Sequence, residues 1–344
     1  MTTPDTNETV QFRLSLLLVT VVALVMLGVV VMAQATPVIQ NKVAREIALH
    51  ASVDGMYFFD NGYRDAGDYL LIGQLPAADY SRGGVYFIGA SEMNAGIMTW
   101  LLAPEERRLI HNYALGDLRH TDSGHLVRML VEENGLLRAG GEKTTVILGL
   151  SYYMARRNDE SGGYTDALFH RHGLYTYDWE HGIHRLWHTP IERFVRLERD
   201  RANRFLRALL LTETRVATVR PHPETRIHML RTHMGMEWRS RMESEVRQLA
   251  ALIDYLQTRN VQVRAILHPA GSWHHRYPYY AAYTKLILPV LQARRVPTTD
   301  LTELLTDDEF FDNLHARYSG QVKLHAAYRD LALRSLAEMG IAVR

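Results

Sequence analysis

The most specific feature of the sequence is an apolar run near its N-terminus. Residues Leu14 to Ala33 carry no charge, and only Ser15, Thr20 and Gly28 interrupt the apolar side chains. At about 1.5 Å per residue, a helix over this run spans a hydrocarbon core of roughly 30 Å. We therefore expect a cytoplasmic tail and one transmembrane anchor over residues 1–34, with a soluble part behind it.

A cleaved signal peptide is the alternative for this run, because Ala33-Gln34-Ala35 resembles a small-residue cleavage site. The run is longer than a typical signal core, which favours an uncleaved anchor. Arg13 before it and Lys42 and Arg45 after it leave the positive-inside rule close to neutral. Since the preceding tail is short and polar, we expect a single-pass cell-membrane protein whose large domain lies outside the cytoplasm.

Composition excludes several chemistries. The chain of 344 residues has a net charge of +1, which gives no argument for nucleic acid as a partner. It has no cysteine, so disulfides, thiolate zinc sites and cysteine nucleophiles are excluded. A P-loop, a dinucleotide fingerprint, a Gly-x-Ser-x-Gly elbow and a His-Glu-x-x-His motif are also missing from the sequence. We expect no cofactor.

Strand and helix patterns alternate after a connector over residues 35–82. Strands are predicted at 83–88, 111–116, 144–149, 261–267 and 296–301. Helices are predicted at 123–134, with Ser123 as its cap, and at 242–259, 279–295 and 321–339, the third bent or broken at Pro289. This alternation predicts an α/β domain over residues 83–344, built on a mostly parallel sheet covered on both faces.

Residues 155–240 break the alternation and read as an insertion rich in His, Arg and Trp, with no convincing strand. We expect a helix at about 191–211 that carries six arginines: Arg193, Arg196, Arg199, Arg201, Arg204 and Arg207. They form either a face exposed to solvent or, as the more specific alternative, a contact with anionic lipid.

Histidines cluster in the same insertion: His170, His172, His181, His184 and His188. If the segment is helical, His184 and His188 share one face of the helix. A zinc site is conceivable, but no carboxylate is placed to complete it, so we expect no metal. Other aromatic residues are candidates for a surface rim that faces a polymer or a membrane: Trp179, Trp187, Trp273, His274 and His275. For the tryptophans we prefer ordinary packing in the core as the explanation.

Two short motifs could carry chemistry. Gly89-Ala90-Ser91-Glu92 ends the first strand, so Ser91 lies where ligands bind in open α/β sheets, although a helix N-cap is the alternative for this serine. Asp312-Asn313-Leu314-His315 lies ahead of the last helix. A serine becomes a nucleophile when a histidine, oriented by a carboxylate, accepts its proton. In Asp-x-x-His one short turn can supply both partners. Glu92 favours the N-terminal end of the following helix through the macrodipole.

In this order the motifs resemble the SGNH (GDSL-like) hydrolases, and more narrowly the membrane-anchored DltD family, the D-alanyl transfer proteins of teichoic-acid D-alanylation. The features that match are the N-terminal span, Gly89-Ala90-Ser91-Glu92, residues 146–153 (VILGLSYY), residues 267–273 (LHPAGSW) and Asp312-x-x-His315. The resemblance implies a three-layer, flavodoxin-like parallel sheet for the domain.

The resemblance also implies roles for individual residues. Ser91 would be the nucleophile, His315 the base and Asp312 its orienter, with Ser91, Gly116 and Ser151 as oxyanion donors. Many SGNH enzymes carry an asparagine where this chain has Ser151. A hydroxyl rotates and is less preorganised than an amide, and one lost donor typically costs on the order of 10²–10³ in rate. This difference fits a slower transferase.

The function implied is a serine acyltransferase or esterase acting on O-linked D-alanyl or acetyl groups of a cell-envelope polysaccharide or teichoic acid. The implied partner is a membrane-bound O-acyltransferase of the MBOAT class. Two alternatives remain: a catalytically weak scaffold that docks the acyltransferase and binds the polymer, and a stand-alone carbohydrate or lipid esterase.

Overall fold

The computed structural model describes residues 6–34, 44–45, 47–49, 51–55, 69–157, 173–178, 182–186, 189–210 and 223–343. Its main sheet is built from β1 (Gly84–Ile88), β2 (Ile110–Asn112), β3 (Thr144–Leu150), β6 (Gln262–Leu267) and β7 (Thr298–Asp300). All paired neighbours are parallel, in the order β2-β1-β3-β6-β7. In chain order this is 2-1-3-4-5, the doubly wound flavodoxin-like arrangement. The prediction of an α/β fold with a parallel sheet is confirmed.

The central strands are apolar because the sheet is covered on both faces. Every residue of β1 and β3 is buried, and the two strands pair from Gly84 with Thr144 to Ile88 with Leu148. The edge strand β7 is largely exposed. The two best-protected strands therefore end side by side, and their C-terminal loops share one edge of the sheet.

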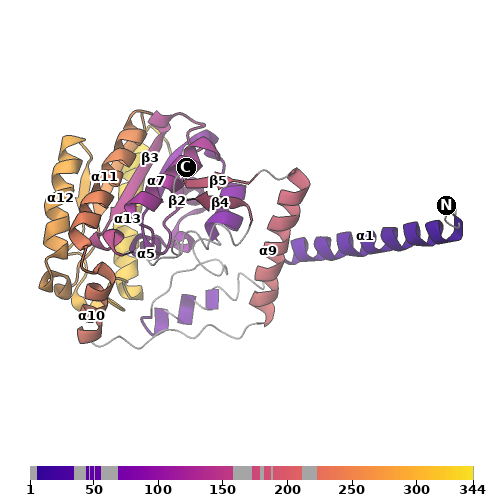
Figure 1. Cartoon of the computed structure of the whole chain (residues 1–344), viewed down its shortest axis with the longest axis horizontal. Helices are drawn as coiled ribbons and strands as arrows, with labels where there is room; N and C mark the ends of the chain where they lie inside the picture. The colour runs from indigo at the N-terminus through magenta and orange to yellow at the C-terminus, as the bar shows by residue number, and fades with distance from the viewer. Residues whose placement is uncertain are drawn as a thin grey trace.

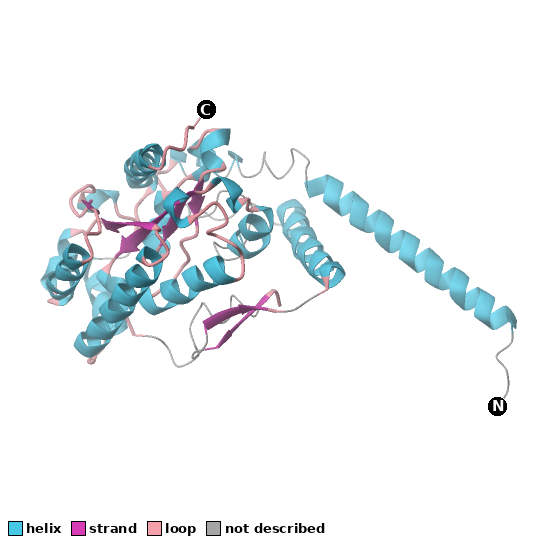
Figure 2. Ribbon diagram, turned by 90° about the horizontal axis from the view of Figure 1, so that it is seen from above, coloured by secondary structure: helices cyan, strands magenta, loops and turns pink. Residues whose placement is uncertain are grey.

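Helices form the outer layers (Figures 1 and 2). The helix α11 (Trp238–Gln257) packs against α7 (His120–Glu132) and α12 (Tyr279–Ala293). On the other face, α13 (Tyr318–Glu338) packs against β1 and against the short α5 (Ser91–Gly96). Short helical segments connect these elements: η1 (Tyr69–Gln74), α4 (Leu75–Ala77), η2 (Tyr80–Arg82), η3 (Thr99–Leu101), α6 (Pro104–Arg107), η4 (Gly141–Lys143), η5 (Tyr152–Ala155), η6 (Ser272–Arg276) and η7 (Asp307–Glu309).

Three element boundaries differ from the predictions. The helix α7 begins at His120, because the Asp122 carboxylate accepts the N–H of Arg119 at 3.2 Å, and Ser123 donates back to the Arg119 carbonyl instead of capping. The second strand is shorter than predicted, since it ends at Asn112. The helix α12 runs through Pro289 without a break.

The insertion contains strands, so the prediction of none there is wrong. The strands β4 (Tyr175–Asp178) and β5 (Gly182–Arg185) pair as an antiparallel hairpin. His184 lies in β5, 3.3 Å from Glu133, so the predicted helical face shared with His188 is also wrong. The remaining histidines and tryptophans singled out in this region lie outside the described residues; they are His170, His172, His181, His188, Trp179 and Trp187.

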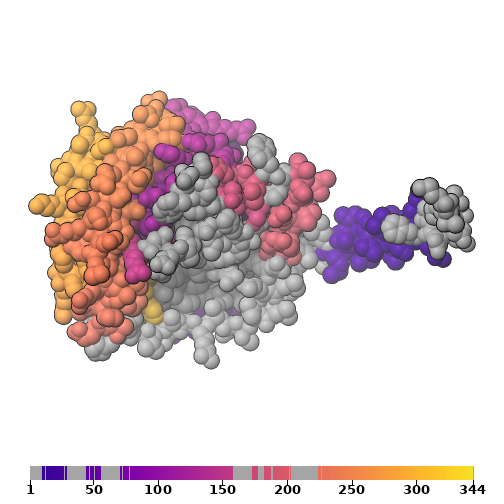
Figure 3. Space-filling model, viewed as in Figure 1, coloured from indigo at the N-terminus to yellow at the C-terminus, as the bar shows by residue number. Residues whose placement is uncertain are grey.

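The helices α9 (Pro190–Leu210) and α10 (Pro223–Met234) follow the hairpin. The helix α9 buries Leu197 and Glu198 and exposes Ile191 and Phe194. It also packs against α1 (Thr6–Gln34), which projects from the α/β body (Figures 1 and 3).

Many apolar side chains of α1 are exposed, including Leu16, Leu18 and Leu24. Among the described residues, the structure has no helix with both the length and the apolar character needed to cross a membrane.

A short segment after α1 caps the last helix. The Asp54 carboxylate accepts the backbone N–H of Ser319 at 2.7 Å and its hydroxyl at 3.0 Å, while the Gly55 carbonyl accepts the N–H of Tyr318 at 2.9 Å. The first N–H groups of a helix have no partners within the helix, so these contacts stabilise the start of α13. Part of the expected connector is thus integral to the α/β body.

Candidate active site

Ser91 lies at the carboxyl edge of the sheet, where the strand order reverses. It is the first residue of α5, two residues beyond Gly89, and it is half-buried. Ser151 follows the neighbouring β3, so the two serines flank the point at which doubly wound sheets bind ligands. Ser91 is the first helical residue rather than the cap, since Ala90 occupies the N-cap position.

Three side chains form a continuous chain of hydrogen bonds. The Ser91 hydroxyl lies 2.7 Å from Nε2 of His315, and Nδ1 of His315 lies 2.7 Å from a carboxylate oxygen of Asp312. The other Asp312 oxygen accepts the backbone N–H groups of Leu314 and His315, each at 2.8 Å. With the carboxylate held in this way, His315 carries its proton on Nδ1 and presents Nε2 as an acceptor to the serine.

Electrostatics favour the same protonation states. Burial alone would lower the pKa of His315, but the hydrogen bond and the charge of Asp312 outweigh it, and the pKa of His315 is raised. Burial would raise the pKa of Asp312, but its hydrogen bond with His315 and the two backbone N–H groups lower the pKa of that carboxyl. The imidazolium that forms when His315 takes the serine proton is therefore stabilised.

One buried tryptophan and one buried histidine hold the turn that carries Asp312 and His315. Trp273 Nε1 donates to the Asn313 carbonyl at 3.1 Å, and His274 Nε2 lies 2.8 Å from the same oxygen. Burial lowers the pKa of His274 to about 4, so its ring is neutral and can donate from Nε2 while Nδ1 accepts from Tyr152. Both side chains are buried, so the packing preferred for Trp273 is confirmed and the predicted place of His274 on an exposed rim is wrong; His275 is exposed.

The turn with Gly116 is fastened to the end of β1. Leu115 donates its N–H to the Gly89 carbonyl at 3.0 Å. Two buried asparagines add to this: Asn94 donates to the Ala114 carbonyl at 2.9 Å, and Asn112 donates to the Asn94 carbonyl at 3.0 Å. These two asparagines are absent from the sequence predictions, because only the fold brings α5 and the loop after β2 together.

The Ser151 hydroxyl oxygen accepts the N–H of Tyr153 at 3.2 Å and so caps η5. A hydroxyl that accepts one hydrogen bond can still donate its proton to another group. The structure thus brings Ser91, Gly116 and Ser151 to one edge of the sheet.

A small cavity lies beside Glu92, the residue that follows Ser91, and two polar side chains that line it were not assigned to the site from the sequence. Glu92 and His268 line it together with Ser151, Tyr152 and Leu314. Nδ1 of His268 lies 2.9 Å from the hydroxyl of Tyr328. A Cβ on Gly149 would come within 2.6 Å of His268 Nε2, so only glycine fits there. In the sequence, the one signal for these two side chains was that Glu92 directly follows Ser91.

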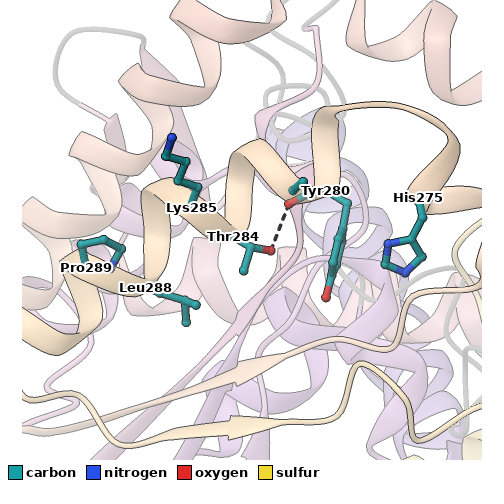
Figure 4. Close-up of a pocket in the computed structure, with 7 residues that line it drawn as sticks. His275, Tyr280, Thr284, Lys285, Leu288 and Pro289 are labelled. Atoms are coloured by element: carbon teal, nitrogen blue, oxygen red, sulfur yellow. Dashed lines mark hydrogen bonds between the residues drawn. The ribbon is translucent and has the colours of Figure 1, made fainter.

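A larger, open groove of about 520 Å³ lies next to this cavity (Figure 4). Tyr280 and Thr284 line both spaces, and the groove extends along α12 past Lys285 and Leu288 to Pro289. The ring of His275 packs edge-on against Tyr280, with 4.8 Å between ring centroids.

Within the described part of the chain, no group of three or more His, Asp or Glu side chains is placed to hold a metal ion.

Comparisons with known proteins add little. No protein-family model matches the chain, and no curated protein matches it. Among solved structures it is similar to a protein from Bacteroides fragilis NCTC 9343 that is described provisionally as an acylhydrolase. The identity is 11%, the match covers 78% of this chain and 95% of that chain, and the TM-score is 0.40. A likeness of this size carries no argument about activity, so the case for a function rests on the site itself.

Proposed function

We propose that the protein is a serine acyltransferase or esterase that works through an acyl-serine intermediate. The observation that carries this proposal is the chain of hydrogen bonds from Ser91 through His315 to Asp312. Nucleophile, base and orienting carboxylate stand in the order that acyl transfer requires.

In the first half of the reaction, Ser91 Oγ attacks the ester carbonyl carbon and its proton passes to Nε2 of His315. The carbonyl oxygen gains the negative charge, and the N–H groups of Ser91 and Gly116, with the Ser151 hydroxyl, are the proposed donors to it. When the tetrahedral intermediate collapses, the bond to the leaving oxygen breaks, and that oxygen takes the proton from His315.

In the second half, His315 accepts a proton from an incoming hydroxyl, which attacks the acyl-serine carbonyl. The acyl group leaves Ser91, and the serine oxygen recovers the proton from His315. Water as the incoming group gives hydrolysis, and a polymer hydroxyl gives transfer. Both outcomes use the same groups on the protein.

The proposed substrates are O-linked D-alanyl or acetyl groups of a cell-envelope polysaccharide or teichoic acid, with an MBOAT-class acyltransferase as partner. The resemblance to SGNH hydrolases and the DltD family supports this assignment. Placement at the outer face of a membrane rests on the charge-free run from Leu14 to Ala33. Recovery of the full chain from a cell lysate in the membrane fraction after an alkaline wash tests whether this run anchors the chain in a membrane.

The test of the chemistry is labelling of the full chain by a serine-directed fluorophosphonate. The wild type and a Ser240→Ala control, altered at a serine on α11 away from the site, should label equally. Ser91→Ala and His315→Ala should not label. Normal labelling of Ser91→Ala would contradict the mechanism, and intact polymer acylation in cells with Ser91→Ala would favour the scaffold alternative. Fast hydrolysis of simple acyl esters without a partner would favour a stand-alone esterase.

A further inference from the structure

Glu92 is a buried carboxylate next to the candidate nucleophile. The residue is only 7% exposed, and its Oε2 lies 3.5 Å from the Ser91 hydroxyl. Its other oxygen, Oε1, is buried and has no hydrogen-bond partner. Burying a charged group without a partner costs several kcal/mol, so this position needs an explanation.

No cation among the described residues compensates Glu92, which forms no ion pair with an arginine or lysine there. The titratable groups on which the charge of Glu92 acts are His315, His268 and the hydroxyls of Tyr152, Tyr283 and Tyr328. Burial lowers the pKa of His268, so that ring is neutral near pH 7. Nε2 of His268 is also buried without a partner.

Glu92 and His268 both line a small cavity. Its free volume is about 20 Å³, and one water molecule needs roughly 10–15 Å³ of such space. There is room for one group the size of a water molecule or an ammonium ion. A long acyl chain does not fit.

We propose that Glu92 is a specificity residue that binds a primary ammonium group carried by the acyl part of the substrate, beside the ester carbonyl. This inference rests on the acyl chemistry proposed at Ser91. An ammonium group supplies the positive charge that the Glu92 carboxylate lacks, and its N–H groups can donate to that carboxylate.

Because Glu92 lies close to Ser91, the ammonium group that it binds belongs to the acyl part of the substrate. Ser91 Oγ is the atom that bonds to the acyl carbon, and Oε2 of Glu92 is 3.5 Å from it. An ammonium one carbon from the carbonyl can reach this carboxylate while the carbonyl carbon is in contact with the serine. A group on the leaving alcohol would lie on the side of His315, which protonates that oxygen.

Two charge isosteres test the inference on the full chain: diphenyl aminomethylphosphonate and diphenyl ethylphosphonate. Each reacts by forming a bond from Ser91 Oγ to phosphorus while phenoxide leaves and His315 takes the serine proton. The aminomethyl probe carries an ammonium group where the ethyl probe carries a methyl group. Hydrogen bonds to charged groups contribute about 1.5–3 kcal/mol, so the wild type should prefer the aminomethyl probe by roughly 10- to 100-fold in second-order inactivation rate.

In Glu92→Gln this preference should fall to near unity, because the amide keeps the shape but not the charge. The control Glu243→Gln removes a carboxylate from the exposed face of α11 and should keep the wild-type ratio. Equal rates for both probes in the wild type would overturn the inference and leave the acyl chemistry intact. An equal drop for both probes in Glu92→Gln would also overturn it, since Glu92 would then act through His315. Failure of both probes to label Ser91 would overturn the acyl chemistry and this inference with it.

Discussion

Ser91 Oγ and His315 Nε2 lie 2.7 Å apart although 224 residues separate them in the sequence. The serine is placed by the end of β1 and the histidine by the turn ahead of α13, so the contact exists only when the whole sheet is assembled. The helix α13, which follows the turn with His315, packs on β1 and on α5, which begins with Ser91, so the distance is a property of the packed core.

The reaction rate should depend on the protonation of His315. Only the neutral ring can accept the serine proton, so the rate of Ser91 phosphonylation should rise with pH through the raised pKa of His315 and then level off. The carboxylates that face His315 are Asp312, Glu92 and Asp117. Burial lowers the pKa of His120 to about 3 and that of His111 to about 4, so neither should titrate in this range. A rate that does not change between acidic and neutral pH would contradict His315 as the base.

Asp312→Asn should slow phosphonylation by roughly 10³–10⁴-fold, because the amide no longer fixes the tautomer of His315. The acid limb of the pH profile should also move to lower pH, since burial of His315 is then opposed by less negative charge. A pH–rate series on the variant checks both effects. An unchanged limb would show that Asp312 does not set the pKa of His315.

Ser151→Ala should lower the maximal rate of acyl transfer by about 10²-fold if its hydroxyl donates to the oxyanion. The lost cap of η5 should cost only about 0.5–2 kcal/mol of unfolding free energy. Rates measured well below the melting temperature separate the two effects. A variant with full activity and lower stability would leave Ser151 with the capping role alone.

Gly96→Ala should destabilise the protein by about 1–3 kcal/mol through overpacking. An added Cβ would lie 2.3 Å from the ring of Tyr328, which is completely buried, stacks on Phe87 and bonds to His268. The matched control is Gly124→Ala inside α7, where nothing lies within 4 Å of the added atom. That change should be stabilising by roughly 0.5–1 kcal/mol. Urea unfolding of both variants gives the comparison, and equal effects would contradict the close contact at Gly96.

The sequence was informative where one local pattern determines the structure. Apolar runs predict β1, β3 and β6 because central parallel strands are buried on both faces, and Asp-x-x-His places a carboxylate beside its histidine within one turn. The start of α7 was misplaced because Ser123 looked like a cap, whereas Asp122 provides it.

Contacts between distant segments could not be predicted in the same way. The position of Trp273 and His274 behind the Asp312 turn depends on contacts between distant segments. Packing was preferred for Trp273 without a contact partner, and His274 was a candidate for an exposed rim. Likewise, nothing local to Glu92 indicates that it lines a cavity together with His268. The hairpin of β4 and β5 was missed because its strands are short and its apolar residues few.

The cap that Asp54 and Gly55 place on α13 determines where the chain can be shortened. The helix α13 begins three residues after His315. A variant that begins at residue 83, the expected start of the catalytic domain, would leave the N–H groups of Tyr318 and Ser319 without these partners. Removal of α1 alone keeps them. The smallest active fragment should therefore begin ahead of residue 51. In fragments that begin later, the rate of Ser91 phosphonylation should fall before the central sheet unfolds.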